Sequence, residues 1–231
     1  MTIRKLETTS DWLSVGTDTK INELMHYLNT LKSQLENMAE DYTKRIEVEL
    51  KKIEKEEEKE GFYEWSEEDY YRYKETFPRI FLNSFHVTAY SFLETEIELI
   101  AKRVGKKQKQ VFDVSEIRGS GNLESAIFYI KKLTGVNAKD KTFASWTGLK
   151  EGQRLRNIIV HSNGELTENK DIQLAKKHKV LLMELRIELP SVRATHIKEL
   201  SITYEYCVSF LDTTKAFFAE LYKQMKVGDF L

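Results

Sequence analysis

The chain has 231 residues, 41% of them hydrophobic and 11% aromatic, which is enough apolar side chain to bury a substantial core and argues against disorder. Only two prolines and ten glycines, among abundant Glu, Lys and Leu, argue against a turn-rich β protein and predict an all-α fold. The formal net charge is −1, yet residues 1–101 carry 13 Lys/Arg against 22 Asp/Glu, and residues 102–186 carry 18 against 9. This asymmetry favours a polyanionic partner for the basic part, unless the acidic part neutralises it within the fold or across a dimer.

The cysteine and hydropathy patterns indicate the compartment. Cys207 is the only cysteine, so the chain has no internal disulfide, and no clustered His or Cys residues have metal-ligand spacing. We therefore expect a reducing environment, no metal and no cofactor. No run approaches the ~18 apolar residues of a membrane span, and the N-terminus lacks an apolar leader segment. We expect a cytoplasmic protein that does not associate with a membrane.

The first predicted element is a long helix that starts at Thr17-Asp18 and has apolar residues at three- and four-residue spacing as far as Ile53. We expect it to continue through the charged segment 51–60 as a solvated helix end, and to stop at Gly61.

An aromatic stretch follows this helix. Ser66 and Asp69 resemble a capping box at its start, and Pro78 marks a kink or a fresh start. The apolar spacing over residues 79–104 then predicts a core helix that ends at Gly105.

Two more helices are predicted before residue 165. One spans residues 123–133 and is closed by Gly135. The other starts near Thr142 and is apolar on almost all sides in its C-terminal half, which predicts a buried, central position. It should end at Ser162-Asn163-Gly164, because Asn and Gly suit the left-handed cap of a helix.

The remaining chain predicts a short basic helix over 171–179, a small β-hairpin near residues 181–203, and a last amphipathic helix over 204–226. The fold class is therefore all-α, a bundle of long antiparallel helices with a possible small β-hairpin. We expect a single domain over 1–231, with an N-terminal helical arm (1–65), a core (78–164) and a C-terminal hairpin and helix (165–231).

The segment Arg154-Leu155-Arg156-Asn157-Ile158-Ile159-Val160-His161 carries the strongest chemical signal. Burying a guanidinium, an amide and an imidazole costs desolvation energy, so such groups in an apolar helix usually have a partner or a function. At 100° per residue Arg154, Asn157 and His161 share one face, whereas Arg156 lies about 140° from His161. A twofold axis is one way to bring two Arg and His sets into a single cleft.

These residues resemble a known family. Arg156-Asn157-Ile158-Ile159-Val160-His161 fits the R-polar-x-x-x-H motif of the HEPN superfamily, and Ser162-Asn163-Gly164 resembles its MAE-type prokaryotic branch. The resemblance extends over about residues 80–164, through "SFLETEIELIAKRVG", "GSGNLESAIFYIKKLTG" and a Trp-bearing stretch.

The resemblance implies a metal-independent endoribonuclease, commonly a homodimer with a composite active site, that serves as a toxin or an antiviral effector and is held inactive by an antitoxin or sensor protein. Arg156, Asn157 and His161 are then the catalytic residues, and we add Arg154, Asn163 and Lys150 as substrate-binding candidates. Imidazole and guanidinium groups suit proton transfer and charge neutralisation at a phosphodiester. The products would carry a 2′,3′-cyclic phosphate and a 5′-OH.

Two other interpretations of the motif remain open. Arg156 and Asn157 satisfy helix-end carbonyls or a neighbouring helix in the first, with His161 as a capped core histidine. In the second, the chain is a non-catalytic HEPN module that binds nucleotide, RNA or a protein. His26, His86, His178 and His196 have no comparable polar neighbours in the sequence and are interpreted as surface or core residues.

Overall fold

The computed structural model describes residues 9–117, 121–141, 143–189 and 192–227, with side chains for 13–117, 121–141, 143–180 and 198–225. In chain order the elements are α1 (Thr9–Leu50), α2 (Glu56–Tyr71), the π-helical turn η1 (Arg72–Thr76), α3 (Phe77–Lys107), the 3₁₀ turn η2 (Val114–Glu116), α4 (Asn122–Thr134), α5 (Trp146–Ser162), α6 (Asn169–Lys177), β1 (Leu181–Leu189), β2 (Val192–Ser201) and α7 (Tyr204–Val227). The predicted all-α fold class is confirmed, with one antiparallel hairpin added to the helices.

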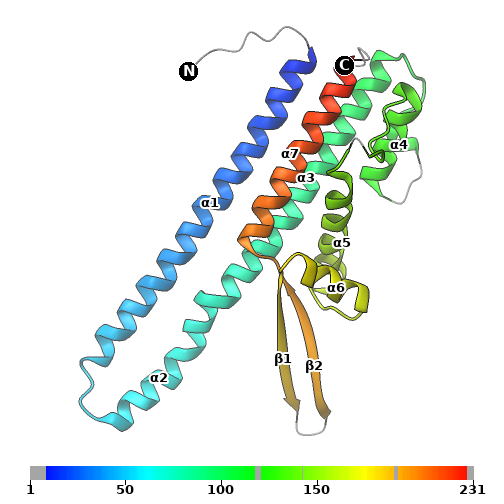
Figure 1. Ribbon diagram of the computed structural model, residues 1–231. Coiled ribbons are helices and arrows are strands. Elements are labelled where there is room, and N and C mark those ends of the chain that lie inside the picture. The colour runs from blue at the N-terminus through cyan, green and yellow to red at the C-terminus, as the bar shows by residue number, and fades with distance from the viewer. Residues whose placement is uncertain (1–8, 118–120, 142, 190–191, 228–231) are drawn as a thin grey trace.

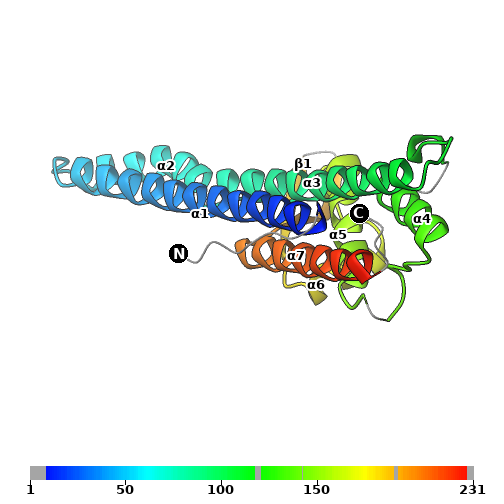
Figure 2. The ribbon, with the colours of Figure 1, turned by 90° about the horizontal axis from the view of Figure 1, so that it is seen from above.

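Two long rods organise the molecule. One is α1, and the other is the continuous run of α2, η1 and α3, which lies antiparallel to α1 (Figure 1). Helix α7 packs on α1, α3 and α5, while α4 and α5 pack along α3 on the side away from α1 (Figure 1). Figure 2 shows the result, an elongated molecule with α2 at one end and α4 at the other.

The core is centred on α3, which contacts α1, α4, α5 and α7. Leu93, Ile97, Ile100 and Val104 are at most 1% exposed. Each such side chain contributes on the order of 1.5–3 kcal/mol by leaving water. Burial by several neighbours explains why α3 is apolar along most of its length. Among the described residues, none of the helices combines the length and apolarity that crossing a membrane requires.

The N-terminal arm differs from its prediction. It is not one helix that stops at Gly61, because α1 ends at Leu50 and Gly61 lies inside α2. The amides of Lys52 and Ile53 bond carbonyls only three residues back, which tightens and closes the first helix. Glu56, Glu57 and Glu58 then occupy the first turn of α2, where negative charge stabilises the positive end of a helix.

The aromatic stretch is also continuous helix. Ser66 does not cap a new helix; it is buried within α2, and its Oγ donates to the Tyr63 carbonyl at 3.0 Å. Pro78 does not begin a separate helix either, because η1 joins α2 directly to α3. We attribute the π-helical turn before Pro78 to the missing amide hydrogen of proline. The predicted stop at Gly105 is wrong by two residues, since α3 ends at Lys107.

The end of α5 is fixed as predicted. Asn163 and Gly164 have φ values of 49° and 84°, in the left-handed region that ends a helix. The Leu200 amide donates to the Gly164 carbonyl at 2.7 Å, which ties this turn to β2. The predicted hairpin is confirmed, with β1 and β2 paired from Leu181 opposite Ser201 to Leu189 opposite Val192.

Close packing of α5 on α7 depends on Gly152. A Cβ at this position would lie 2.4 Å from Cε2 of Phe210 and 2.9 Å from its Cδ2, inside van der Waals contact.

Gly152→Ala should therefore lower the free energy of unfolding by about 1–3 kcal/mol in urea titrations. Gly61→Ala is the matched control, because a Cβ inside α2 meets nothing within 4 Å. It should raise stability by roughly 0.5–1 kcal/mol. Equal effects of the two substitutions would contradict this packing.

Candidate functional site

The helix that carries the motif lies at the surface. Its buried residues lie along one face and contact α3 and α7: Leu149, Gly152, Leu155 and Ile158. The prediction that this helix is buried and central, with apolar residues on almost all sides of its C-terminal half, is wrong, because Val160 is 46% exposed and both Asn157 and His161 are exposed. The opposite side of α5 is covered only in part, by α6, so Asn157 and His161 are open to solvent.

Four polar side chains form a stripe along the outer face of α5. Lys150, Arg154, Asn157 and His161 are four, three and four residues apart, which places them on one side of the helix. The first three line an open groove of about 500 Å³ between α5 and α6, together with Lys170. His161 lies one turn beyond Asn157, in the last turn of α5.

The cations of this groove already have carboxylate partners. Lys150 donates to Glu124 at 2.5 Å. Arg154 is paired with Asp171 through its Nε, and Lys170 with Glu168 at 2.5 Å. A phosphate that entered the groove would have to exchange with these carboxylates, which reduces the net attraction for a polyanion.

Arg156 is separated from the stripe. It is half-buried, and its Nη1 donates to Oδ1 of Asn157 at 3.1 Å. Its Nε is buried without a hydrogen-bond partner among the described residues. Burial raises the pKa of Glu94 on α3, and the nearby positive charge of Arg156 partly opposes that shift. Arg156 thus lies near Glu94 of α3 and bonds Asn157, and no hydrogen bond joins it to His161 among the described residues.

The turn after the motif presents the last two candidates. His161 is exposed in the last turn of α5, and Asn163 is exposed at the left-handed position that follows. The Gly164 amide donates to the Ile158 carbonyl at 3.1 Å, which completes the cap. The structure therefore brings Asn157, His161 and Asn163 to the open end of α5, with Lys150 and Arg154 farther along the helix.

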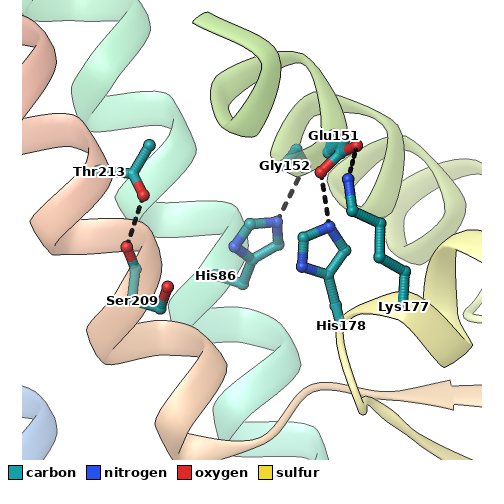
Figure 3. A network of polar contacts seen from close by, with 7 residues as sticks. All are labelled: His86, Glu151, Gly152, Lys177, His178, Ser209 and Thr213. Atoms are coloured by element: carbon teal, nitrogen blue, oxygen red, sulfur yellow. Dashed lines mark hydrogen bonds and ion pairs between the residues drawn. The ribbon is translucent and has the colours of Figure 1, made fainter. Parts of the chain in front are cut away.

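The sequence analysis did not predict a cluster of polar contacts around His86 and His178 (Figure 3). His178, in the turn after α6, contacts Glu151 of α5, with 2.8 Å between Nε2 and Oε2, and Lys177 is paired with the other oxygen of Glu151. His178 has no such polar neighbours in the sequence, and it is the fold that brings Glu151 and His178 together. The contact joins residues 27 positions apart, and no local spacing in the sequence indicates it.

His86 is the buried member of this region. Its Nε2 donates to the Gly152 carbonyl at 3.0 Å, and its ring lies edge-on to Tyr206 and Phe210. Burial lowers the pKa of His86 to about 4. Its classification as a core residue is confirmed, and a neutral imidazole inside the protein has a structural role here rather than access to a substrate.

Glu151 is the ionised partner in the cluster. Burial alone would raise its pKa, but hydrogen bonds from Lys177 and His178 outweigh burial and leave the pKa of Glu151 below its ordinary value. This carboxylate holds the end of α6 against α5, and so helps to form the wall of the groove beside Arg154.

A more apolar groove lies elsewhere. It has a volume of about 580 Å³ and runs between α1 and the junction of η1 with α3. Its walls are mainly apolar, from Leu35, Ala39, Phe81 and Leu82. It contains no histidine, so it is not the site that the motif indicates. Within the described part of the chain, no group of three or more His, Cys, Asp or Glu side chains is placed to hold a metal ion.

Comparison with protein-family models, with curated proteins and with solved structures finds no match to this chain. The assignment of a function therefore depends on the residues and their geometry.

Proposed function

We propose that this chain is a metal-independent endoribonuclease of the HEPN type, acting as a toxin or an antiphage defence protein. The single observation that carries the proposal is the exposed His161 one turn from Asn157, which is itself held by Arg156. An exposed imidazole beside an oriented hydrogen-bond donor can supply the proton transfer and the charge stabilisation that metal-free cleavage of RNA requires.

The reaction assigned to this face is internal transesterification. His161 removes the proton of the 2′-OH, the 2′-oxygen forms a bond to phosphorus, and the bond from phosphorus to the 5′-oxygen breaks. A protonated imidazole supplies the proton that the leaving 5′-oxygen takes up. The products are a 2′,3′-cyclic phosphate and a 5′-OH, and no electrons are transferred.

The geometry favours separate roles for the two arginines. Arg156 donates to Oδ1 of Asn157, which leaves the amide NH₂ of Asn157 available to donate to a phosphate oxygen. In one subunit Arg156 is thus a positioning residue. Arg154 shares the face of Asn157 and His161, so its guanidinium is the group that would bind the phosphate. The phosphate would take the place of the Asp171 carboxylate, which is paired with Arg154 in the free protein. A homodimer would add the same groups from a second copy.

A second candidate is a non-catalytic module that binds RNA, nucleotide or a protein. The ion pairs of Lys150 and Arg154 favour it, because both cations already have partners in the absence of substrate. The positive charge of Arg156 near Glu94 of α3 favours it as well, since a structural role accounts for that placement.

Expression in a bacterial host tests the proposal. The wild-type chain should slow growth and fragment cellular RNA, and His161→Ala and Arg156→Ala should relieve both effects. Immunoblots must show equal amounts of the three proteins. Equal growth and equally intact RNA in all three strains would count against a nuclease, and RNA that copurifies uncut with the wild type would support the binding module.

A further inference from the structure

The charge of this chain is divided between the two ends of its long rod. We call α2 (Glu56–Tyr71) the acidic tip; it contains eight Asp/Glu and only Lys59 as a base. Glu60, Glu64 and Glu67 are four and three residues apart, so they share one side of the helix. All three are exposed and have no ion pair among the described residues. The acidic tip therefore presents a row of uncompensated carboxylates.

The acidic tip also presents aromatic rings to solvent. Tyr63 is 57% exposed, Trp65 69%, and Tyr70 and Tyr71 44% each. Aromatic side chains of this size are enriched at protein interfaces and are unusual in such density on a free surface. Carboxylates interleaved with exposed Tyr and Trp fit a basic protein surface, and they repel a nucleic acid.

The other end of the rod is basic. We call residues 102–141 the basic end; their sequence has ten Lys/Arg against four Asp/Glu. The exposed side chains of Lys106, Lys131 and Lys132 have no ion pair in the described part of the chain. Phe128 is 46% exposed beside them, with the ammonium of Lys132 at 5.3 Å from its ring centre. The basic end is thus opposite in charge to the acidic tip, and it exposes an aromatic ring as the acidic tip does.

The two ends do not meet within one molecule. The run from Glu56 to Lys107 is continuous helix, and at 1.5 Å per residue it places Glu60 and Lys106 roughly 70 Å apart. Figures 1 and 2 both place α2 and α4 at opposite ends. The screening length at physiological salt is about 8 Å, so the charges of the two ends do not compensate each other through solvent. Neutralisation within the fold is excluded for these segments.

We propose that two copies of this chain associate antiparallel, with the acidic tip of each copy docked on the basic end of the other. A twofold axis near the middle of the two α2–α3 rods, one from each copy, satisfies both contacts at once. The axis exchanges the copies, so it brings each acidic tip to the basic end of the other copy. The inference is independent of the nuclease proposal. The competing occupant of the basic end is RNA, which would use the same lysines and leave the acidic tip uncovered.

Charge reversal tests the pairing by sedimentation equilibrium of the purified full chain at low salt. The wild type should have twice the 27.2 kDa mass of one chain. A tip variant (Glu60→Lys, Glu64→Lys, Glu67→Lys) and a basic-end variant (Lys106→Glu, Lys131→Glu, Lys132→Glu) should each bind themselves at least roughly tenfold more weakly, because like charges then face each other. An equimolar mixture of the two variants should form dimers again, since each reversed end meets an opposite charge.

The matched control reverses three exposed acids outside both ends, as Glu23→Lys, Glu205→Lys and Asp212→Lys. It changes the net charge as much as the tip variant and should leave the dimer intact, and circular dichroism confirms that every variant is folded. A monomeric wild type, a mixture that stays monomeric, or open polymers in place of dimers would each overturn the proposal. So would a basic-end variant that loses only the binding of polyuridylate and still dimerises.

Discussion

His161→Ala is expected to reduce the rate of RNA cleavage by about 10²- to 10⁴-fold, the contribution typical of a side chain that transfers protons in a transition state. The exposed position of His161 at the end of α5 means that its removal leaves no cavity in the core. The loss should therefore appear in the rate and not in the unfolding midpoint. A fluorogenic RNA in buffer with EDTA gives the rate, and thermal denaturation gives the midpoint.

Three further variants show what the loss of activity means. His26 is also an exposed histidine but lies on α1, so His26→Ala should cleave RNA at the wild-type rate. Arg154→Lys and Arg156→Lys separate the assigned roles: the first should mainly raise KM, and the second should mainly lower kcat by releasing Asn157. Cleavage by His161→Ala at the wild-type rate would remove the imidazole from the mechanism.

Acidification from pH 6.5 to pH 4 is expected to lower the free energy of unfolding by about 3 kcal/mol through His86 alone. Burial lowers the pKa of His86 to about 4 from an ordinary value of 6.5. Between these values the unfolded chain binds a proton at this residue and the folded chain does not. Protons therefore favour unfolding, and stability falls as the pH falls through this window. Urea titrations at several pH values measure the slope.

The matched variants for this effect are His86→Gln and His26→Gln. A glutamine at position 86 keeps a donor for the Gly152 carbonyl but does not titrate, so the pH dependence should flatten. His26 is exposed on α1, so His26→Gln is the control for replacing a histidine by glutamine outside the core. The lowered pKa of Glu151 acts at more acidic pH, because its stabilisation is lost only as the pH falls below the ordinary value of about 4.5. A steep slope that survives in His86→Gln would show that another group is responsible.

Local sequence signals predicted the helices that end in clear caps. Gly135 and Asn163-Gly164 take the left-handed conformation at the ends of α4 and α5, as their residue types indicated. The predicted helix end at Gly61 and the predicted fresh start at Pro78 were wrong, because a single glycine or proline is tolerated inside a helix that is stabilised by its neighbours. Packing against α1 explains why the rod from α2 to α3 continues through both residues.

The candidate site was predictable in its residues but not in its surroundings. Helical spacing alone places Arg154, Asn157 and His161 on one face and Arg156 on another. It does not reveal that α5 is at the surface, since apolar Ile159 and Val160 suggested burial on all sides. Nor does it reveal the ion pair of Arg154 with Asp171, or the cluster around Glu151, because these contacts come from the docking of α6 on α5.

The termini of cleaved RNA test the central claim most directly. Purified wild-type protein is incubated with a single-stranded RNA in EDTA, beside the same RNA carrying 2′-deoxy sugars at every position. We expect cleavage of the first substrate only, with fragments that end in a 2′,3′-cyclic phosphate and begin with a 5′-OH. Fragments with a 3′-OH, cleavage of the deoxy substrate, or intact RNA at every enzyme concentration would contradict the proposed role of His161.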